Sequence, residues 1–442
     1  MDNKLAVLLD RTLDPDYGII RYIKELPLMP EEPDIFITVA EFQDPFIVSP
    51  RGEDRKFRMD RQSAGASLDR ESSIWSAIGE GIERFGGAVY DPDSITWAAS
   101  KDLQADNFVH PNDFILFSKD QYDNPNIKYT RHNPNIPIGW TTAKRLSDQK
   151  KVYFPASLAF FAYEYKDKSE YLTDSYSTGL ACGPTKEWAA CSGLYEVIER
   201  DAYSLHWAAK QSPKKIEIEQ AIDCADPELK KLLIDVKRKG IELFLCDITN
   251  DIGVPTIMAI SKIPNKPGIA LGASSNLCIK TALKKAIVES FHTFNWCLIT
   301  ESKDEKIKKE EILMFLDHVR YYMENEEQEQ FADFFWKTTE RSELLDGLSS
   351  TSPLSTLDHA QQLEILVSKL EKLGHHSYLI DITPNDIANL GLHVTKAVVP
   401  SLQPMWCGYG RVPLDRRRFE QFLKYKGKDL NIAINEEIHP FP

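Results

Sequence analysis

The sequence predicts an α/β or α+β fold in which mixed sheets are flanked by helices. Runs with strand-like composition and runs with helical periodicity alternate along the whole chain, which favours sheets covered by helices. The chain has 442 residues, of which 42% are hydrophobic and 27% charged, enough for two or three domains' worth of globular core.

The first 100 residues predict one helix on each side of a strand. The apolar run 17–26 predicts a helix, a proline-rich turn follows, and "DIFITVA" (34–40) predicts a strand. The stretch "RQSAGASLDRE" (61–71) is typical of a loop. The helical pattern "SSIWSAIGEGIERFGG" (72–87) comes next.

Residue types at the ends of two helices predict where they begin and stop. Asp69 or Ser67 is placed to cap the helix 72–87, and Gly86-Gly87 predicts its end. A glycine-containing turn leads into the long helix with "GLYEVIERDA" (193–202), in which Pro184 suits the first helical position.

The remaining elements follow from composition. Residues 101–155 predict loops, and the charged region 301–345 predicts solvated helices. Strands are predicted at 241–249 and 254–261, either as a hairpin or as neighbouring strands. The other expected elements are a helix at 279–294, strands at 377–383 and 393–400, and a helix at 413–427. Within this last helix, "DRRRF" (415–419) predicts a solvated face or, less favoured, a contact for an acidic peptide.

Charge, hydropathy and cysteines exclude several classes of protein. The formal net charge of −14 argues against a broad nucleic-acid-binding face. The sequence has neither an apolar run of membrane-spanning length nor a signal peptide. Its seven scattered cysteines contain no C-x-x-C pair, which argues against a thiolate zinc site and suits a reducing cytoplasm. We therefore expect a cytoplasmic protein that binds neither nucleic acid nor membrane.

The pattern E-x-x-E-R occurs twice, in similar apolar surroundings. It comprises Glu80, Glu83 and Arg84 in one helix, and a second set, Glu196, Glu199 and Arg200, in the other. Residues three or four apart share a helix face, so each pair of carboxylates points the same way. Burying like charges together is costly unless cations offset them.

The residue types and their spacing alone leave two interpretations of these helices open. In one, Arg84 and Arg200 neutralise the glutamates in structural salt bridges. In the other, the helices pack side by side and four carboxylates hold magnesium ions against a triphosphate. No Walker motif is present to bind phosphate in another way.

The ordered set of motifs resembles the YcaO-domain family. The set is "SAIGEGIERF", "STGLACG", "GLYEVIERDA", "ALKKAIVESFHT" and the ending "HPFP", and it is most similar to the standalone D-protein type of azoline-forming cyclodehydratase. The resemblance covers about residues 60–442, which implies a YcaO-like catalytic domain with its ATP site between the duplicated Glu-bearing helices. Residues 1–59 are then an N-terminal extension packed on it.

The resemblance implies an activity. Enzymes of this family use ATP to phosphorylate a backbone amide oxygen of a ribosomally made precursor peptide, so that Cys, Ser or Thr side chains cyclise to thiazolines or oxazolines. Backbone thioamidation and a non-catalytic scaffold within a peptide-modifying complex are the alternatives. The resemblance also implies partners: a leader-binding C protein of E1-like type and a flavin dehydrogenase. It further implies that the chain assembles as a homodimer or in a hetero-complex.

Site residues follow by carry-over from the family. Glu80, Glu83, Glu196 and Glu199 would bind magnesium, and Pro442 would provide a catalytic base through its α-carboxylate. The residues implied for nucleotide binding are Ser73, Arg84, Glu187, Arg200, Lys285 and Glu289.

Several positions depart from the family pattern. Lys285 stands where family members often have Arg, and His292 stands where they often have Gln. Trp188 stands where they often have Glu, and Glu187 is its neighbour. Ile438 replaces the first proline of the usual P-x-P-x-P tail. We expect the tail to insert into the site rather than fray, and to contribute little to stability. The ten histidines show no metal-ligand spacing and are interpreted as structural or surface residues.

Overall fold

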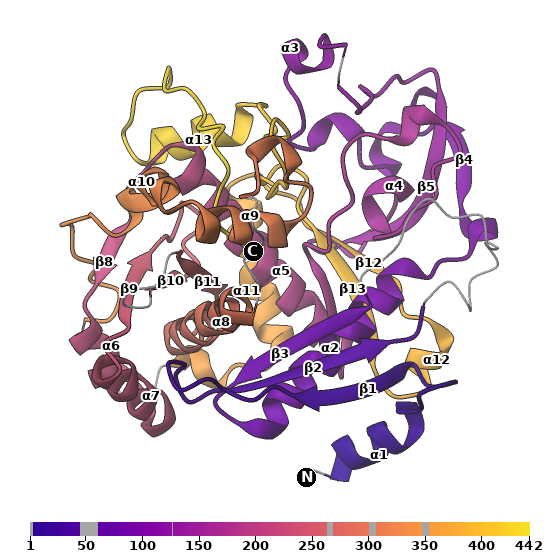
Figure 1. The fold of residues 1–442 in the computed structure, drawn as a ribbon. Coiled ribbons are helices and arrows are strands. Elements are labelled where there is room, and N and C mark those ends of the chain that lie inside the picture. The colour runs from indigo at the N-terminus through magenta and orange to yellow at the C-terminus, as the bar shows by residue number, and fades with distance from the viewer. Residues whose placement is uncertain (1–2, 45–60, 126, 263–267, 300–305, 347–352) are drawn as a thin grey trace.

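A computed structural model of the chain describes residues 3–44, 61–125, 127–262, 268–299, 306–346 and 353–442. The expected combination of helices and sheets is confirmed (Figure 1). The expected division between an N-terminal extension and the main domain, at residues 59 and 60, lies outside the described residues.

The strands form three sheets, and every pairing between these named strands is antiparallel. The expected mixed sheets are therefore antiparallel in their strand pairs, and parallel pairing occurs among the described residues as the isolated bridges Leu13–Ile20, Phe108–Tyr153 and Lys215–Arg341. The first sheet has the order β1 (Ile20–Glu25), β2 (Phe36–Phe42), β3 (Gln62–Ser67). The second has the order β4 (Thr96–Ala99), β5 (Pro137–Arg145), β12 (Tyr378–Asp381), β13 (His393–Val398), β7 (Leu180–Gly183), with β6 (Lys151–Pro155) also on β5. The third has the order β11 (Ala270–Ser275), β10 (Thr256–Lys262), β9 (Glu242–Asp247), β8 (Lys214–Ile216).

Three long helices each lie between two sheets. They are α2 (Arg70–Ala88), α5 (Lys186–Ala208) and α8 (Ile279–Ile299). Helix α2 packs on β2 and β3 on one side and on β7 and β13 on the other. Helix α5 contacts β13, β7 and β11, and α8 contacts β10, β11 and β3. The three helices therefore close a ring with the three sheets and meet at its centre.

Glycines let two of these helices lie close to their strands. A Cβ added to Gly65 of β3 would stand 2.3 Å from the carbonyl oxygen of Ser73 on α2. A Cβ on Gly272 of β11 would stand 2.3 Å from the amide nitrogen of Ser290 on α8. Both obstacles are backbone atoms, so only glycine permits this spacing.

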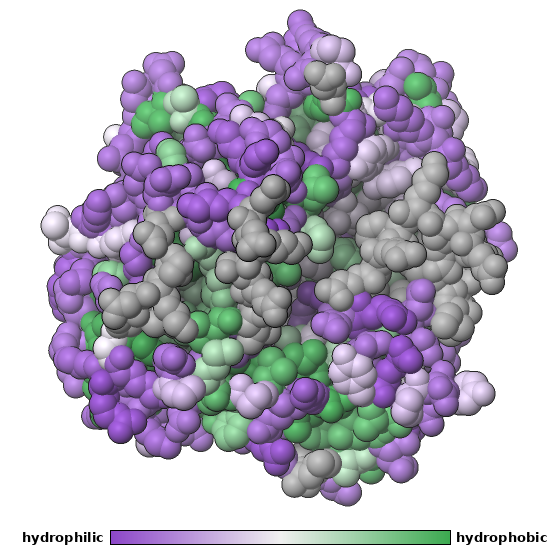
Figure 2. All heavy atoms as spheres, viewed as in Figure 1, coloured by the Kyte–Doolittle hydropathy of each residue, from purple (hydrophilic) through white to green (hydrophobic). Residues whose placement is uncertain are grey.

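The remaining helices are shorter and lie around these three long helices. Their bounds are α1 (Asn3–Thr12), α3 (Lys119–Tyr122), α4 (Ala156–Ala159), α6 (Ile218–Cys224), α7 (Pro227–Arg238), α9 (Phe315–Glu324), α10 (Glu329–Ala332), α11 (His359–Lys372), α12 (Asn385–Ala388) and α13 (Arg417–Tyr425). Across the described residues, none of the helices combines the length and hydrophobicity needed to cross a bilayer. Figure 2 shows hydrophobic residues gathered over the three-stranded sheet β1–β3.

Two predictions for the N-terminal region are wrong. The run 17–26 contains strand β1 rather than a helix, because it pairs with β2 from Tyr22 to Glu25. A short apolar run suits a helix and a strand equally well, and only the neighbouring strand decides between them. The expected loop 61–71 contains strand β3, whose small residues suit the close approach of α2 rather than a turn.

The helix ends are partly as expected. Asp69 is the N-cap of α2, and its side chain accepts a hydrogen bond from the amide of Ser72 at 2.8 Å. Gly86 and Gly87 do not end that helix, which runs to Ala88; they make room for Val394 and Leu180. Helix α5 begins at Lys186 after the N-cap Thr185, so Pro184 precedes the helix instead of opening it.

The middle of the chain holds more strands than expected. The region 101–155 contains β5 and β6 besides loops, and β11 precedes the third helix. Strands β9 and β10 are antiparallel neighbours, as one alternative held. The charged region 301–345 is only partly helical, with buried Tyr322 and Phe335 among its described residues.

The stretch 415–419 is not a solvated helix face. The side chain of Arg418 is fully buried, and its guanidinium donates to Asp201 at 2.6 Å and to Asp251 at 2.6 Å. Asp201 also accepts from the amide of Gln403 and from Asn250, both at 2.7 Å. Local composition could not predict this, because Asp201 lies 217 residues away in the chain. The network fixes the side of α5 that faces away from the glutamates.

We expect Arg418→Met to lower the free energy of unfolding by about 3–5 kcal/mol, because it leaves two carboxylates buried without their cation. The matched control is Arg417→Met on the same helix, where the side chain is 53% exposed and pairs with Asp415. That control should cost at most about 1 kcal/mol. Urea unfolding monitored by circular dichroism measures both, and equal losses would contradict a structural role for the buried network.

Candidate active site

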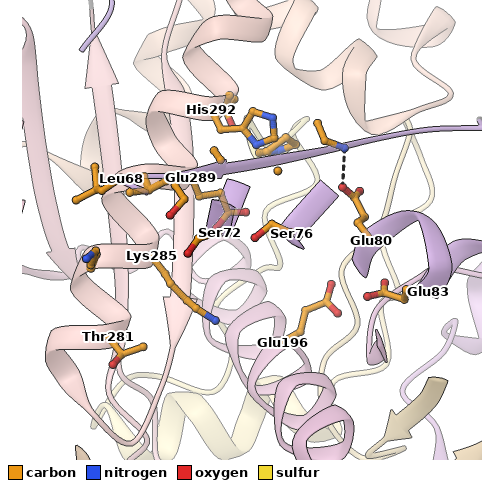
Figure 3. A pocket seen from close by; sticks show the side chains of 18 of the residues that line it. Leu68, Ser72, Ser76, Glu80, Glu83, Glu196, Thr281, Lys285, Glu289 and His292 are labelled. Atoms are coloured by element: carbon orange, nitrogen blue, oxygen red, sulfur yellow. Dashed lines mark hydrogen bonds between the residues drawn. The ribbon is translucent and has the colours of Figure 1, made fainter. Parts of the chain in front are cut away.

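A cavity of about 920 Å³ opens where α2, α5 and α8 meet. Each helix contributes carboxylates to it: Glu80 and Glu83 from α2, Glu196 from α5 and Glu289 from α8. Figure 3 shows the carboxylates of Glu83 and Glu196 facing one another, the carboxylate of Glu80 turned toward the amide that it accepts from, and the amine of Lys285 on the side of Glu196. The two E-x-x-E-R helices thus converge, as the second interpretation of the sequence required.

The predicted residues divide into those at the cavity and those away from it. Lining it are Glu80, Glu83, Arg84, Glu196, Arg200, Lys285, Glu289 and Pro442. Glu199 does not line the cavity; it lies buried behind it, next to Glu289 and Arg200. Ser73 is fully buried against β2, where its hydroxyl lies 2.8 Å from that of Thr38. Glu187 is exposed in the first turn of α5, nine residues from Glu196 and therefore about 13 Å along the helix.

A backbone amide holds each of three carboxylates in place. Glu80 accepts from Ala64 of β3 at 3.0 Å, Glu196 from Gly179 at 2.9 Å, and Glu289 from Ala273 of β11 at 3.2 Å. A carboxylate that accepts from a strand or loop amide has a fixed orientation. The ring of helices and sheets thus aims these groups into the cavity before any ligand binds.

The arginines of the two E-x-x-E-R patterns also lie near glutamates, as the interpretation of structural salt bridges expected. Arg84 forms an ion pair with Glu80 one turn earlier and donates to the carbonyl oxygen of Gln62 at 2.8 Å. The guanidinium of Arg200 lies 3.6 Å from Glu196 and 3.8 Å from Glu199. Its Nε atom, which faces Glu199, is buried and makes no hydrogen bond. Arg200 therefore lies at ion-pair distance from both glutamates and lines the cavity beside them.

The protein alone does not balance the negative charge of the site. Burial, followed by repulsion from Glu196 and Glu80, raises the pKa of Glu83 well above its usual range. Burial and repulsion from Glu289 do the same to the pKa of Glu199, and burial raises the pKa of Glu289 to about 7. Burial also raises the pKa of Glu196, although Arg200 and the amide of Gly179 oppose the shift. Such shifts arise where carboxylates lack sufficient cations.

These residues fit a magnesium–triphosphate ligand. Within the residues that the structure describes, no three His, Cys, Asp or Glu side chains already form a metal-binding group. Magnesium is commonly held by one or two carboxylates together with phosphate oxygens and waters, so a closed protein cage is not needed. Carboxylates from three helices, with the guanidinium of Arg200 beside them, suit a ligand that brings its own oxygens and cations.

Sequence reasoning missed several residues of the cavity. Ser72 and Ser76 of α2 face it, whereas Ser73 between them does not. His292 also lines it, and burial lowers its pKa to about 4, which favours a neutral ring. The buried amine of Lys396 on β13 acts electrostatically on Glu196 and donates to the carbonyl oxygen of Tyr176 at 3.0 Å. For Ser72 and Ser76, helical spacing relative to Glu80 was the available signal.

The last residues of the chain enter this cavity. Phe441 is fully buried, with its ring 4.5 Å from that of Tyr203, and Pro442 lines the cavity. The Nη1 atom of Arg200 lies 3.5 Å from the backbone oxygen of Pro442, and its guanidinium lies 4.5 Å from the centre of the Phe441 ring. The tail is packed rather than frayed. The expectation that it contributes little to stability is not supported by its burial, because removing Phe441 would expose a core site.

Comparison with solved structures shows a shared fold. A heterocyclase in complex with substrate and cofactor superposes with a TM-score of 0.79 at 21% identity, covering 99% of this chain and 57% of that chain. The chain thus spans little more than half of that heterocyclase. A YcaO protein from Methanopyrus kandleri bound with AMPPCP and Mg²⁺ gives a TM-score of 0.62 at 17% identity, covering 90% of each chain.

Sequence comparison agrees with the fold. An uncharacterised protein of Methanothermobacter thermautotrophicus is 26% identical over 351 residues, which are 77% of this chain and 81% of that protein. Residues 64–403 match the family described as YcaO cyclodehydratase, ATP- and Mg²⁺-binding. That span contains β3, α2, α5 and α8 and the carboxylates that they bring together, and the chain belongs to the YcaO family.

Proposed function

We propose that this chain is an ATP-dependent cyclodehydratase that acts on backbone amides of a ribosomally made precursor peptide. The observation that carries the proposal is the set of five glutamates gathered from three helices, four of which line one cavity. Burial raises the pKa of Glu83, Glu199 and Glu289, and repulsion between neighbouring carboxylates adds to it. The magnesium of a magnesium–triphosphate ligand offsets that repulsion, and the family description names the same ligands.

The residues take separate roles in this proposal. Glu80, Glu83 and Glu196 would bind magnesium from the cavity wall, and Glu199 would act from behind them. Arg200, whose guanidinium lines the cavity, would bind phosphate oxygens, with Arg84, Lys285 and Glu289 around the nucleotide. Bound ATP and magnesium would supply the phosphoryl group and neutralise its charge. Ser73 and Glu187 lie outside the cavity, so we assign neither to the nucleotide.

The proposed reaction converts an amide into a ring. A Cys, Ser or Thr side chain of the peptide attacks the preceding carbonyl carbon, and the former amide oxygen leaves as phosphate after accepting the phosphoryl group. The α-carboxylate of Pro442 would accept a proton in this sequence, because its residue lies in the cavity beside Arg200. A non-catalytic scaffold would not need these carboxylates, so their presence around one cavity favours a catalytic role.

We also propose that a partner protein recruits the leader segment of the precursor, in a homodimer or hetero-complex, and that the protein is cytoplasmic. The heterocyclase that shares this fold extends well beyond the part that this chain covers. The free thiols of all seven cysteines suit a reducing compartment. Mass spectrometry of the precursor after incubation with ATP, magnesium and partner tests the activity: loss of water supports cyclodehydration, whereas exchange of oxygen for sulfur would support thioamidation.

The metal carboxylates can be tested without a peptide. We expect Glu196→Gln to weaken binding of AMPPCP with magnesium by at least about a hundredfold, since even indirect partners of metal ligands contribute 10–100-fold. The melting temperature without ligand should stay equal or rise, because the substitution removes a charge that burial disfavours. Isothermal titration calorimetry and thermal melts measure the two effects.

The same substitution elsewhere on α5 provides the control. Glu187→Gln changes an exposed glutamate outside the cavity and should leave the affinity within about twofold. Equal affinity in the Glu196→Gln and wild-type proteins would contradict the assignment of the metal site.

The role of Pro442 predicts a strict dependence on tail length. One glycine appended after Pro442 would displace the carboxylate by about 3 Å, and we expect azoline formation to fall about a hundredfold. Affinity for AMPPCP with magnesium should change little, because the glutamates remain. Deleting Phe441 is a poorer test, since its buried ring stabilises the fold. Azoline formation at the wild-type rate in the extended variant would exclude Pro442 as the base.

A further inference from the structure

The chain's last residues run back along one face of α5. The indole nitrogen of Trp207 donates to the carbonyl oxygen of Glu437 at 3.1 Å. Four residues earlier on that helix, Tyr203 contacts Phe441, and Arg200 reaches Pro442. Arg200, Tyr203 and Trp207 have helical spacing i, i+3 and i+7, so they form one stripe. The tail follows that stripe toward Glu196 and Glu199, and Figure 1 shows the C-terminus at the middle of the molecule.

Helix α9 holds the tail from the other side. The hydroxyl of Tyr322 donates to the carbonyl oxygen of Ile438 at 2.7 Å, and Nδ1 of His318 lies 2.8 Å from the carbonyl oxygen of His439. Both side chains are almost fully buried, and they stand four residues apart on one helix face. Three successive carbonyls of the tail, at Glu437, Ile438 and His439, therefore each accept from a different buried side chain.

The partners of His318 fix its protonation state. Its Nε2 accepts from the amide of Gly408 at 2.9 Å, so Nδ1 carries the hydrogen that the His439 carbonyl accepts. Burial lowers the pKa of His318 to about 4, consistent with a neutral ring. The ring of His439 in turn donates through Nε2 to the carbonyl oxygen of Trp406 at 2.7 Å.

These contacts determine the register of the tail. Two of its last three residues are prolines, which have no amide hydrogen, and this segment belongs to none of the three sheets. Its buried carbonyls depend on side-chain donors, and an unpaired buried carbonyl is costly. A slip by one residue would move the tail about 3 Å and leave the fixed donors of α5 and α9 without their acceptors.

We propose that His318 and Tyr322 are positioning residues that clamp the tail in the register that places Pro442 in the cavity. The proposal deepens the proposed function and rests on it, since Pro442 acts in catalysis only there. Neither side chain is among the residues that line the cavity, so they act through the tail.

The test begins with tail mobility, which requires no peptide substrate. In Tyr322→Phe and in His318→Phe, hydrogen–deuterium exchange of the segment 437–441 should accelerate about tenfold, because each variant removes a buried hydrogen bond. The matched control is Tyr163→Phe, which removes a buried hydroxyl bond of 2.7 Å to Glu170 far from the tail. Affinity for AMPPCP with magnesium should stay within about twofold in all three variants. Unchanged exchange in both clamp variants would overturn the proposal, whatever the enzyme does.

The second measurement links the clamp to chemistry. Tyr322→Phe should lower azoline formation about tenfold on a precursor with its partner protein, whereas Tyr163→Phe should not. In the variant with glycine appended after Pro442, Tyr322→Phe should cost nothing further, since the terminus is already displaced. If Tyr322→Phe instead lowers azoline formation by the same factor in the wild-type and glycine-extended proteins, its effect is merely structural. That result would overturn the proposed positioning role.

The outcomes separate the two proposals. If the clamp variants free the tail and azolines still form at full rate while the glycine extension abolishes them, the positioning role of His318 and Tyr322 is wrong and that of Pro442 stands. If the extended variant is also fully active, the base assigned to Pro442 is wrong, and the positioning role falls with it.

Discussion

The rest of the structure depends on one electrostatic constraint, the gathering of five glutamates at the meeting point of three helices. Burial raises the pKa values of four of them, Glu83, Glu196, Glu199 and Glu289, which means that their ionised forms are disfavoured where they stand. A fold tolerates such a site only if the surrounding framework is rigid enough to hold it. Here each carboxylate-bearing helix is wedged between two sheets, and backbone amides of Ala64, Gly179 and Ala273 orient the side chains.

Helix α5 takes part in three arrangements. Glu196 and Arg200 line the acidic cavity, with Glu199 buried behind them, and Asp201 turns the other way to meet Arg418. Tyr203 and Trp207 support the tail. Because the helix is almost wholly buried, each side has a fixed partner, and a rotation that improved one contact would break the others.

The tail and the acidic cavity meet at Arg200. This guanidinium lies near Glu196, Glu199, the ring of Phe441 and the backbone oxygen of Pro442. A single cation thus faces both the proposed metal ligands and the proposed base.

The sequence by itself determined the helices that carry the chemistry and the residues on them, because the spacing of E-x-x-E-R is a property of one helix turn and needs no partner. It also reduced the N-cap of α2 to Asp69 or Ser67, and it marked the late strands and the late helix by local composition. Tertiary structure decided what depends on distant partners. Residues 20–25 are a strand because β2 lies beside them, and 62–67 are a strand because small residues admit α2. Arg418 is buried because Asp201, 217 residues away, meets it, and Ser76 rather than Ser73 faces the cavity because β2 takes the other side of α2. Helical periodicity shows which residues share a face, but only packing against the neighbouring sheets shows which face meets the cavity.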